Sequence, residues 1–165
     1  MSSPLDERIK IVDNFLSKDE YKIVIDTVRS ATWKTQVSDR KKSHNYFLMY
    51  DVTDVSFFNK TLCDKIQKEF QLSNRLKRVY FNGQWFSRDG DFHVDGSDKT
   101  VLIYISNHDI SWGGFTHFFE PPNNEYIISP VTNRLVIFPG NIMHKAYSFS
   151  NQNCPMRISL AFKFV

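Results

Sequence analysis

The sequence lacks the features that mark membrane, secreted and disordered proteins. It contains two cysteines, Cys63 and Cys154, and no apolar run that approaches the ~20 residues of a membrane span. Residues 1–10 are polar, so we expect no secretory signal, a cytoplasmic location and free thiols. There is no internal repeat, low-complexity tract or linker rich in proline, glycine or serine. These absences favour a single globular domain over residues 1–165.

A strong charge of either sign is also missing. The formal net charge is +3, from 21 basic and 18 acidic residues, and the basic residues form only short clusters such as 40–42. Domains that bind nucleic acid usually carry a longer basic track. We therefore expect neither a nucleic-acid partner nor a membrane partner. The 41% hydrophobic and 15% aromatic content is instead typical of a chain with a substantial core.

Residues 1–75 are predicted to supply supporting helices. Ser17 is placed as an N-cap, and Glu20 follows at the spacing of a capping box. Apolar residues then recur at helical spacing from Tyr21 to Val28. A second helix is predicted over about 54–70, with one buried face formed by Val55, Phe58, Leu62, Ile66 and Phe70.

The pattern changes to short strands in residues 76–165. β-Branched and aromatic runs alternate with turn residues and predict strands at 76–82, 84–87, 91–95, 99–106, 115–119, 125–128, 133–138, 142–148 and 156–164. Helices followed by many short strands predict a mainly β fold. In that fold, helices buttress one sheet of a β-sandwich or jelly roll.

The last predicted strand separates two kinds of side chain. Ile158, Leu160, Phe162 and Phe164 share one face, which we expect to pack on the helices. Arg157 and Ser159 lie on the opposite face, which is predicted to look into the sandwich. A buried cation needs an anionic partner. The sequence offers no evident acidic match for Arg157, so we expect a ligand to supply one.

His93, Asp95 and His144 form the candidate metal site. His93 and Asp95 are two positions apart, so on a strand they would point to the same face, and they lie between a turn and Gly96. His144 follows the turn at 139–140 on a neighbouring predicted strand. Two imidazoles and one carboxylate can hold iron(II) and leave positions open for a co-substrate and oxygen. Taken alone, the three residues are as compatible with two surface residues and a buried structural histidine as they are with a metal site.

The residues around this triad resemble a known family. The matching segments, in order, are Tyr80–Gly83, His93–Asp95, Thr100–Asn107, Trp112–Thr116, Arg134–Phe138 leading to His144, and Arg157–Ser159. Residues 76–165 thereby resemble the iron(II)- and 2-oxoglutarate-dependent dioxygenases, most closely the prolyl-4-hydroxylase-like branch. Its small bacterial and phage members are similar in size. The resemblance implies a double-stranded β-helix core of the cupin-like jelly-roll type.

The resemblance also implies roles for particular residues. His93, Asp95 and His144 match the iron ligands, and Arg157 matches the basic residue that holds the distal carboxylate of 2-oxoglutarate. Tyr80 matches a tyrosine near that carboxylate, and Asn82 and Ser159 are expected to face the same pocket. Two further tyrosines of the family align here with Gly90 and Ile105.

The implied activity is hydroxylation of an aliphatic C–H with release of succinate and CO2. The expected co-substrates are O2 and 2-oxoglutarate, with ascorbate as a reductant, and a prolyl residue in a peptide or protein is the expected substrate. The polar, basic segment 34–46 is expected to close over it. Two alternatives stay open: an oxygenase of the same fold for a small molecule, another side chain or a nucleobase, and a non-catalytic jelly-roll module that binds a metal or ligand.

Overall fold

The computed structural model describes residues 4–37 and 46–165, which form helices and two antiparallel sheets. The helices are α1 (Leu5–Arg8), α2 (Lys18–Arg29), the π-helix η1 (Phe57–Leu62), α3 (Cys63–Phe70) and the 3-10 helix η2 (Ile110–Trp112). The strands are β1 (Lys10–Val12), β2 (Lys34–Val37), β3 (Tyr46–Asp51), β4 (Leu76–Gln84), β5 (Lys99–Tyr104), β6 (Thr116–Glu120), β7 (Asn124–Ile128), β8 (Leu135–Pro139), β9 (Met143–Ala146) and β10 (Arg157–Phe164).

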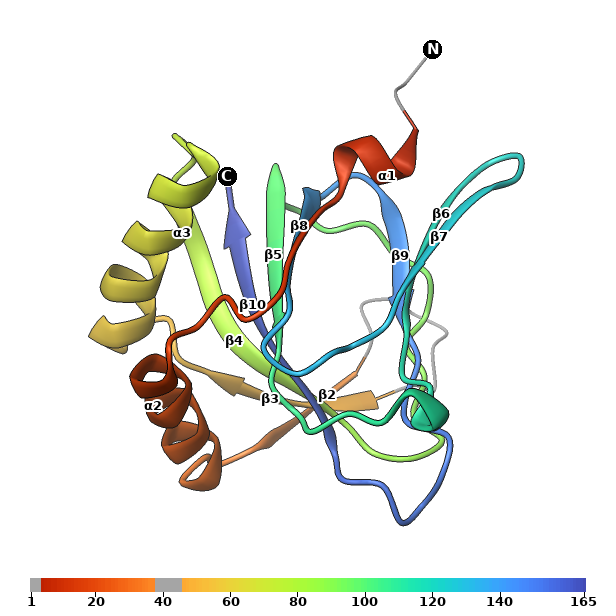
Figure 1. Cartoon of the computed structure of the whole chain (residues 1–165), viewed down its shortest axis with the longest axis horizontal. Helices are drawn as coiled ribbons and strands as arrows, with labels where there is room; N and C mark the ends of the chain where they lie inside the picture. The colour runs from red at the N-terminus through yellow and green to blue at the C-terminus, as the bar shows by residue number, and fades with distance from the viewer. Residues whose placement is uncertain (1–3, 38–45) are drawn as a thin grey trace.

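The larger sheet has the order β1-β8-β5-β10-β4-β3-β2, and the smaller sheet has the order β7-β6-β9. Helices α2 and α3 lie on one side of the larger sheet, and β6, β7 and β9 lie on its other side (Figure 1). This arrangement confirms the predicted mainly β jelly roll with buttressing helices. No helix in the described residues has the length and apolar character that a membrane crossing requires.

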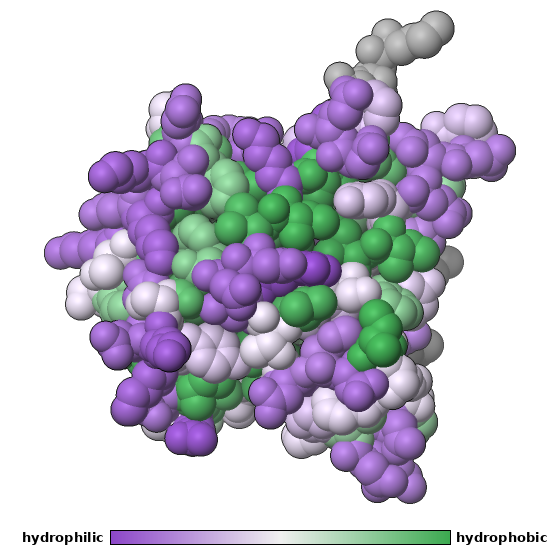
Figure 2. All heavy atoms as spheres, viewed as in Figure 1, coloured by the Kyte–Doolittle hydropathy of each residue, from purple (hydrophilic) through white to green (hydrophobic). Residues whose placement is uncertain are grey.

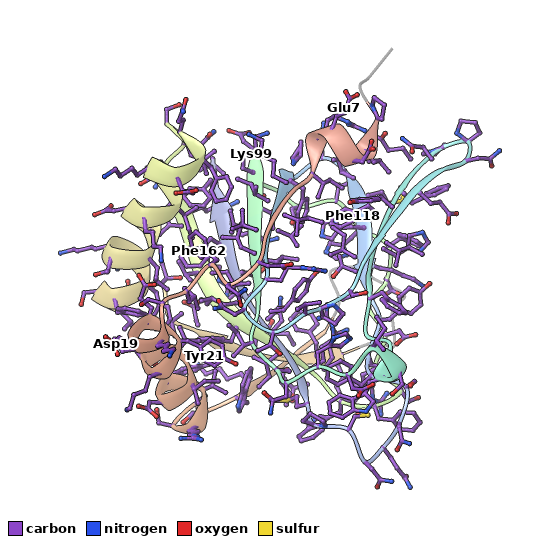
Figure 3. The ribbon with its side chains drawn as sticks, viewed as in Figure 1. Glu7, Asp19, Tyr21, Lys99, Phe118 and Phe162 are labelled. Carbon is purple, nitrogen blue, oxygen red and sulfur yellow. The ribbon has the colours of Figure 1, made fainter. Side chains whose placement is uncertain are left out.

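Strand β10 lies at the centre of the larger sheet and separates two cores. Leu160, Phe162 and Phe164 belong to the core beneath the helices, whereas Ala161 belongs to the core between the sheets. Figure 3 labels Phe162 on the helix side and Phe118 on the side of the smaller sheet. The alternation predicted for this strand is therefore confirmed. It directs Arg157, Ser159 and Lys163 into a pocket between the sheets.

The first predicted helix is confirmed in detail. The side chain of Ser17 accepts a hydrogen bond from the backbone of Glu20, and the Glu20 side chain accepts one from the backbone of Ser17. This capping box satisfies N–H groups that would have no partner inside the helix. On the side shown in Figure 2, hydrophilic side chains cover much of the outer surface of α2 and α3, as amphipathic helices require.

The second predicted helix differs at its start. It begins with the π-helical turn η1 and continues as α3, and Phe58, Leu62 and Ile66 are completely buried, as predicted. The prediction for Val55 was wrong, because this side chain precedes the helix and is 42% exposed. A helical period cannot be extended past the point where the helix begins.

Three further features differ from the sequence predictions. Residues 1–75 supply strands β1, β2 and β3 of the larger sheet in addition to helices. The predicted strand at 91–95 is wrong, since this segment pairs only through an isolated bridge at His93. The predicted strand at 84–87 is also wrong, because β4 ends at Gln84 and a turn follows. Most of the expected lid, residues 38–45, lies outside the described residues.

Both cysteines are free, as predicted. Cys63 is buried and Cys154 is partly exposed. Burial raises the pKa of the Cys63 thiol to about 11, so the thiol is protonated and unreactive at neutral pH.

Candidate metal centre and anion pocket

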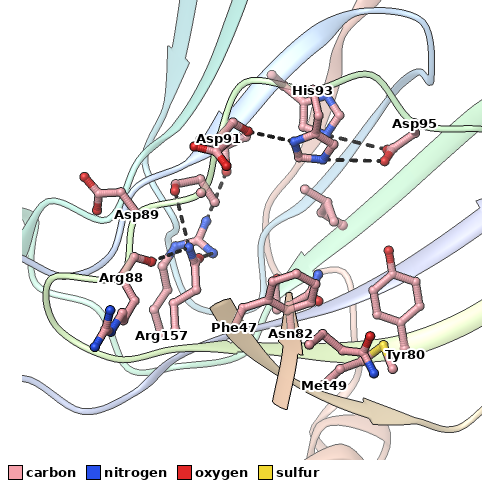
Figure 4. A pocket seen from close by; sticks show the side chains of 18 of the residues that line it. Phe47, Met49, Tyr80, Asn82, Arg88, Asp89, Asp91, His93, Asp95 and Arg157 are labelled. Atoms are coloured by element: carbon pink, nitrogen blue, oxygen red, sulfur yellow. Dashed lines mark hydrogen bonds and ion pairs between the residues drawn. The ribbon is translucent and has the colours of Figure 1, made fainter. Parts of the chain in front are cut away.

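A pocket of about 280 Å³ is lined by strands of both sheets. The residues predicted for the site all line it: Tyr80, Asn82, His93, Asp95, His144, Arg157 and Ser159. Figure 4 shows the region around His93 and Asp95 and the region around Arg157 as neighbouring parts of this pocket. The fold therefore brings side chains from distant parts of the chain into one pocket.

Three side chains that can bind a metal meet in this pocket. His93 and Asp95 come from the segment between β4 and β5, and His144 comes from β9. One donor atom from each residue lies within 4.8 Å of the other two. Backbone hydrogen bonds of 3.0 and 2.9 Å link His93 and His144 in both directions. This bridge holds the two imidazoles side by side, with ring centroids 4.4 Å apart.

Hydrogen bonds hold both histidines in the tautomer that can bind a metal through Nε2. The Nδ1 atom of His93 lies 2.8 Å from the carbonyl oxygen of Asp91, and that of His144 lies 2.8 Å from the carbonyl oxygen of Ile142. A carbonyl can only accept, so each Nδ1 carries a proton, and in the neutral form of each ring the lone pair lies on Nε2. The Nε2 atoms lie 3.7 Å (His93) and 3.6 Å (His144) from oxygens of Asp95.

The charge states of His144 and Asp95 suit a divalent cation. Burial lowers the pKa of His144 to about 4, although Asp95 opposes this shift. Burial alone would raise the pKa of Asp95, but Lys163 and His144 outweigh it, and the pKa lies below its ordinary value. At neutral pH the pocket therefore offers a neutral buried imidazole and a carboxylate, which are the forms that bind a metal. Two histidines and one carboxylate are the donor set of the iron(II) facial triad.

Asp95 has two further partners that the sequence reasoning missed. Thr100 donates a hydrogen bond of 2.6 Å to Oδ2, and the Lys163 ammonium forms an ion pair with the same oxygen. Burial lowers the pKa of Lys163, and Asp95 opposes this shift. The sequence did contain an indication of this contact, because the alternation of β10 puts a lysine on the inward face.

Arg157 is 2% exposed and forms the second part of the site. Its guanidinium donates hydrogen bonds to the carbonyl oxygen of Gly114 (2.8 Å), to Oε1 of Gln84 (3.0 Å) and to Oγ1 of Thr116 (3.1 Å). Burial lowers the pKa of Arg157, yet an arginine keeps its charge in proteins. Because these partners are neutral, the cation suits an anionic ligand such as a carboxylate.

Tyr104 and Ile105, at the end of β5, lie on opposite faces of the larger sheet. Ile105 belongs to the core under the helices, whereas Tyr104 is buried between the sheets. The Tyr104 ring centroid lies 5.4 Å from the guanidinium carbon of Arg157, and its hydroxyl donates a hydrogen bond of 2.7 Å to Thr116. A shift of one residue along a strand exchanges its two faces. The side chain of this region that lies near Arg157 is therefore Tyr104 and not Ile105.

The structure places Gln84, not Tyr80, directly beside Arg157. Gln84 pairs with Arg157 across β4 and β10, while Tyr80 pairs with Ala161 further along the ladder. The Tyr80 ring packs against the guanidinium of Arg78, with its centroid 4.8 Å from the guanidinium carbon. Tyr80 thus lines the pocket at a distance from the anion-binding position predicted for it.

Asn82 and Ser159 pair with each other across β4 and β10. Their pair lies between the Gln84–Arg157 pair and the Tyr80–Ala161 pair. Oδ1 of Asn82 is buried and has no hydrogen-bond partner in the described part of the chain. A buried acceptor without a partner is costly. Its presence in the pocket fits a ligand that donates a hydrogen bond there.

Solved structures share this fold over nearly the whole chain. An oxidoreductase of the 2OG-Fe(II) oxygenase family from Burkholderia pseudomallei has a TM-score of 0.79 at 8% identity, covering 96% of this chain and 85% of that one. A Trichoplax adhaerens prolyl hydroxylase, in complex with a peptide fragment of the hypoxia inducible factor oxygen degradation domain, has a TM-score of 0.72 at 16% identity, covering 95% and 83%.

HygX from Streptomyces hygroscopicus, with nickel and 2-oxoglutarate bound, has a TM-score of 0.70 at 10% identity, covering 95% of this chain and 82% of that one. No profile of a protein family and no curated protein sequence matches the chain. The likeness therefore lies in the three-dimensional arrangement and not in overall sequence. This chain has the fold of the 2-oxoglutarate- and iron(II)-dependent oxygenases.

Proposed function

We propose that this chain is an iron(II)- and 2-oxoglutarate-dependent dioxygenase that hydroxylates a prolyl residue in a peptide or protein. One observation carries the proposal. His93, Asp95 and His144 gather in the same pocket as Arg157, a buried cation whose hydrogen-bond partners among residues 4–37 and 46–165 are neutral. A metal-binding module would need only the first three residues, and a module for an anion would need only the last.

Each residue has a defined task under this proposal. His93, Asp95 and His144 hold the iron, and Arg157 holds the distal carboxylate of 2-oxoglutarate with its planar fork. When bound, iron and 2-oxoglutarate supply the oxidation of an aliphatic C–H, with succinate and CO2 as by-products. Gln84 and Thr116 fix the orientation of Arg157, and the carbonyl partners of the histidines fix the ring tautomers.

The prolyl part of the proposal has separate support. One structural neighbour is a prolyl hydroxylase with a peptide fragment bound. The pocket of this chain is also bordered by the aromatic side chains of Tyr46 and Phe47 from strand β3. An extended proline-containing peptide has little conformational entropy to lose on binding, so a shallow aromatic border can hold it.

The metal and co-substrate part is tested without oxygen. Iron(II) and then 2-oxoglutarate are added to the protein under anaerobic conditions, and the visible spectrum is recorded. We expect a metal-to-ligand absorption band that requires both additions and is absent with succinate in place of 2-oxoglutarate. Absence of the band in protein that is folded and binds iron would refute the co-substrate assignment.

The substrate part is tested with peptides. A library of proline-containing peptides is incubated with iron, 2-oxoglutarate and oxygen, and each product is examined by mass spectrometry. We expect succinate release above the level without peptide, together with a gain of one oxygen atom on proline. Stimulation by a free amino acid or a nucleotide, with none by peptides, would keep the oxygenase and replace its substrate.

A further inference from the structure

Lys163 is a cation buried in the pocket beside the metal-binding residues. It lies on the inward face of β10, pairs with Thr100 of β5, and has a side chain that is only 13% exposed. Removing an ammonium from water costs several kcal/mol unless it is paired. Its ion-pair partner is Asp95, and its Nζ atom also lies 3.2 Å from the hydroxyl of Thr100.

The two oxygens of Asp95 have different surroundings. Oδ2 receives both the Thr100 hydroxyl and the Lys163 ammonium, whereas Oδ1 faces Nε2 of His93 at 3.7 Å. Oδ2 also lies 3.6 Å from Nε2 of His144, so distance alone would let either oxygen reach an ion held by the histidines. The donors decide between the two oxygens, because they occupy the lone pairs of Oδ2 and leave those of Oδ1 available.

We propose that Lys163 and Thr100 together are positioning residues that restrict Asp95 to binding the metal through Oδ1 alone. A carboxylate that binds through one oxygen leaves three of six metal positions open, while one that binds through two oxygens leaves two. The inference rests on the proposed function, which needs two positions for 2-oxoglutarate and one for oxygen. Lys163 and Thr100 thereby keep the third open metal position, the one for oxygen, from being taken by Asp95.

The test uses cobalt(II) bound to the whole protein in place of iron. X-ray absorption at the cobalt edge distinguishes a carboxylate bound through one oxygen from one bound through two, and visible absorption reports the coordination number. Lys163→Met removes charge and donor, Lys163→Gln keeps a neutral donor on a side chain one atom shorter, and Thr100→Val removes the other donor at similar volume. Lys77→Met is the matched control, because Lys77 is exposed and contacts the Gly96 carbonyl and not Asp95.

We expect one-oxygen binding in the wild type, in Lys163→Gln and in Lys77→Met. In Lys163→Met and Thr100→Val we expect a measurable fraction with two-oxygen binding, larger in Lys163→Met. Unchanged one-oxygen binding in Lys163→Met or in Thr100→Val would overturn the proposal. If Lys163→Met does not fold, as judged by its thermal melting curve, Thr100→Val still decides the question. A wild-type protein that binds no cobalt would refute the metal centre itself.

Discussion

At the scale of single residues, His93 and His144 differ in exposure but should be equally necessary. The His93 side chain is 47% exposed and His144 is buried, yet the proposed metal centre takes one Nε2 from each. We expect His93→Ala or His144→Ala to abolish turnover and to weaken iron binding by at least about 10-fold, the loss typical of removing even a supporting contact. His117→Ala is the control, because His117 contacts Glu125 outside the pocket. Iron titration and succinate release measure the effect, and native values in either variant would exclude that histidine from the centre.

Arg157 should act on the co-substrate and not on the metal. Two charge-assisted hydrogen bonds to a carboxylate contribute on the order of 1.5–3 kcal/mol each. Arg157→Ala should therefore raise the 2-oxoglutarate concentration needed for half-maximal turnover by roughly 100-fold or more, with iron binding retained. Arg157→Lys should be intermediate, because a point charge replaces the fork. An unchanged requirement in a folded Arg157→Ala protein would mean that the anion binds elsewhere.

The sequence predicted the residues of the candidate site better than their partners. His93, Asp95, His144 and Arg157 stand in a recognisable order in the sequence. Strand parity applies to His144 on β9 and Arg157 on β10, whereas His93 and Asp95 lie on a segment that meets β9 at an isolated bridge. The resemblance aligned a tyrosine with Ile105, which faces the helices, whereas the neighbouring Tyr104 faces the space between the sheets, because adjacent residues of a strand point to opposite faces. Gln84 could not be predicted as the neighbour of Arg157, because that contact depends on the register between β4 and β10.

At the scale of secondary-structure elements, the helical support offers a direct test of burial. Phe58 is fully buried in η1 and meets the Phe81 ring edge-on, with centroids 5.6 Å apart. We expect Phe58→Ala to reduce the free energy of unfolding by about 3–5 kcal/mol. Val55→Ala, at a position 42% exposed, should change it by no more than about 0.5 kcal/mol. Urea unfolding measures both, and similar losses in the two variants would contradict the packing described for η1.

Elements with strong local patterns could be predicted, and those that depend on distant pairing could not. Strand β10 alternates cleanly, and its position and faces were predicted correctly. Strand β1 has three residues and forms only because β8 pairs with it. The segment 91–95 has the composition of a strand, but it meets β9 at a single bridge. Nothing local to a segment indicates whether a neighbouring edge exists to pair with it.

At the scale of the whole molecule, the burial of His144 should make the stability of the metal-free protein depend on pH. The pKa of His144 is about 4 in the folded protein, against an ordinary value of 6.5. The unfolded chain therefore binds the proton preferentially between these values, and the free energy of unfolding falls as pH drops from about 6.5 towards 4. The total contribution is on the order of 3 kcal/mol and does not grow at lower pH.

The measurement is urea unfolding in the presence of a chelator at several pH values between 4.5 and 7. His144→Asn serves as the comparison, because it does not titrate. We expect the wild type to lose more stability on acidification than this variant. Parallel pH profiles would show that the buried imidazole does not control this dependence.

The pairing of the strands also determines how readily the backbone in different parts of the site should unfold locally. Strand β10 is hydrogen bonded to β4 and β5 along its two edges, so its amide hydrogens should exchange with deuterium only when the whole domain unfolds. The segment that carries His93 is not part of a strand ladder: its backbone is held by the His93–His144 bridge and by single hydrogen bonds from Gly90 to Ala146 and from Asp95 to Gly140, so it should open locally. Arg157 and Lys163 thus belong to the slowly exchanging part of the molecule, and His93 belongs to the rapidly exchanging part. Escape of a bound ion should therefore begin on the His93 side, at a rate set by that local opening and not by global unfolding.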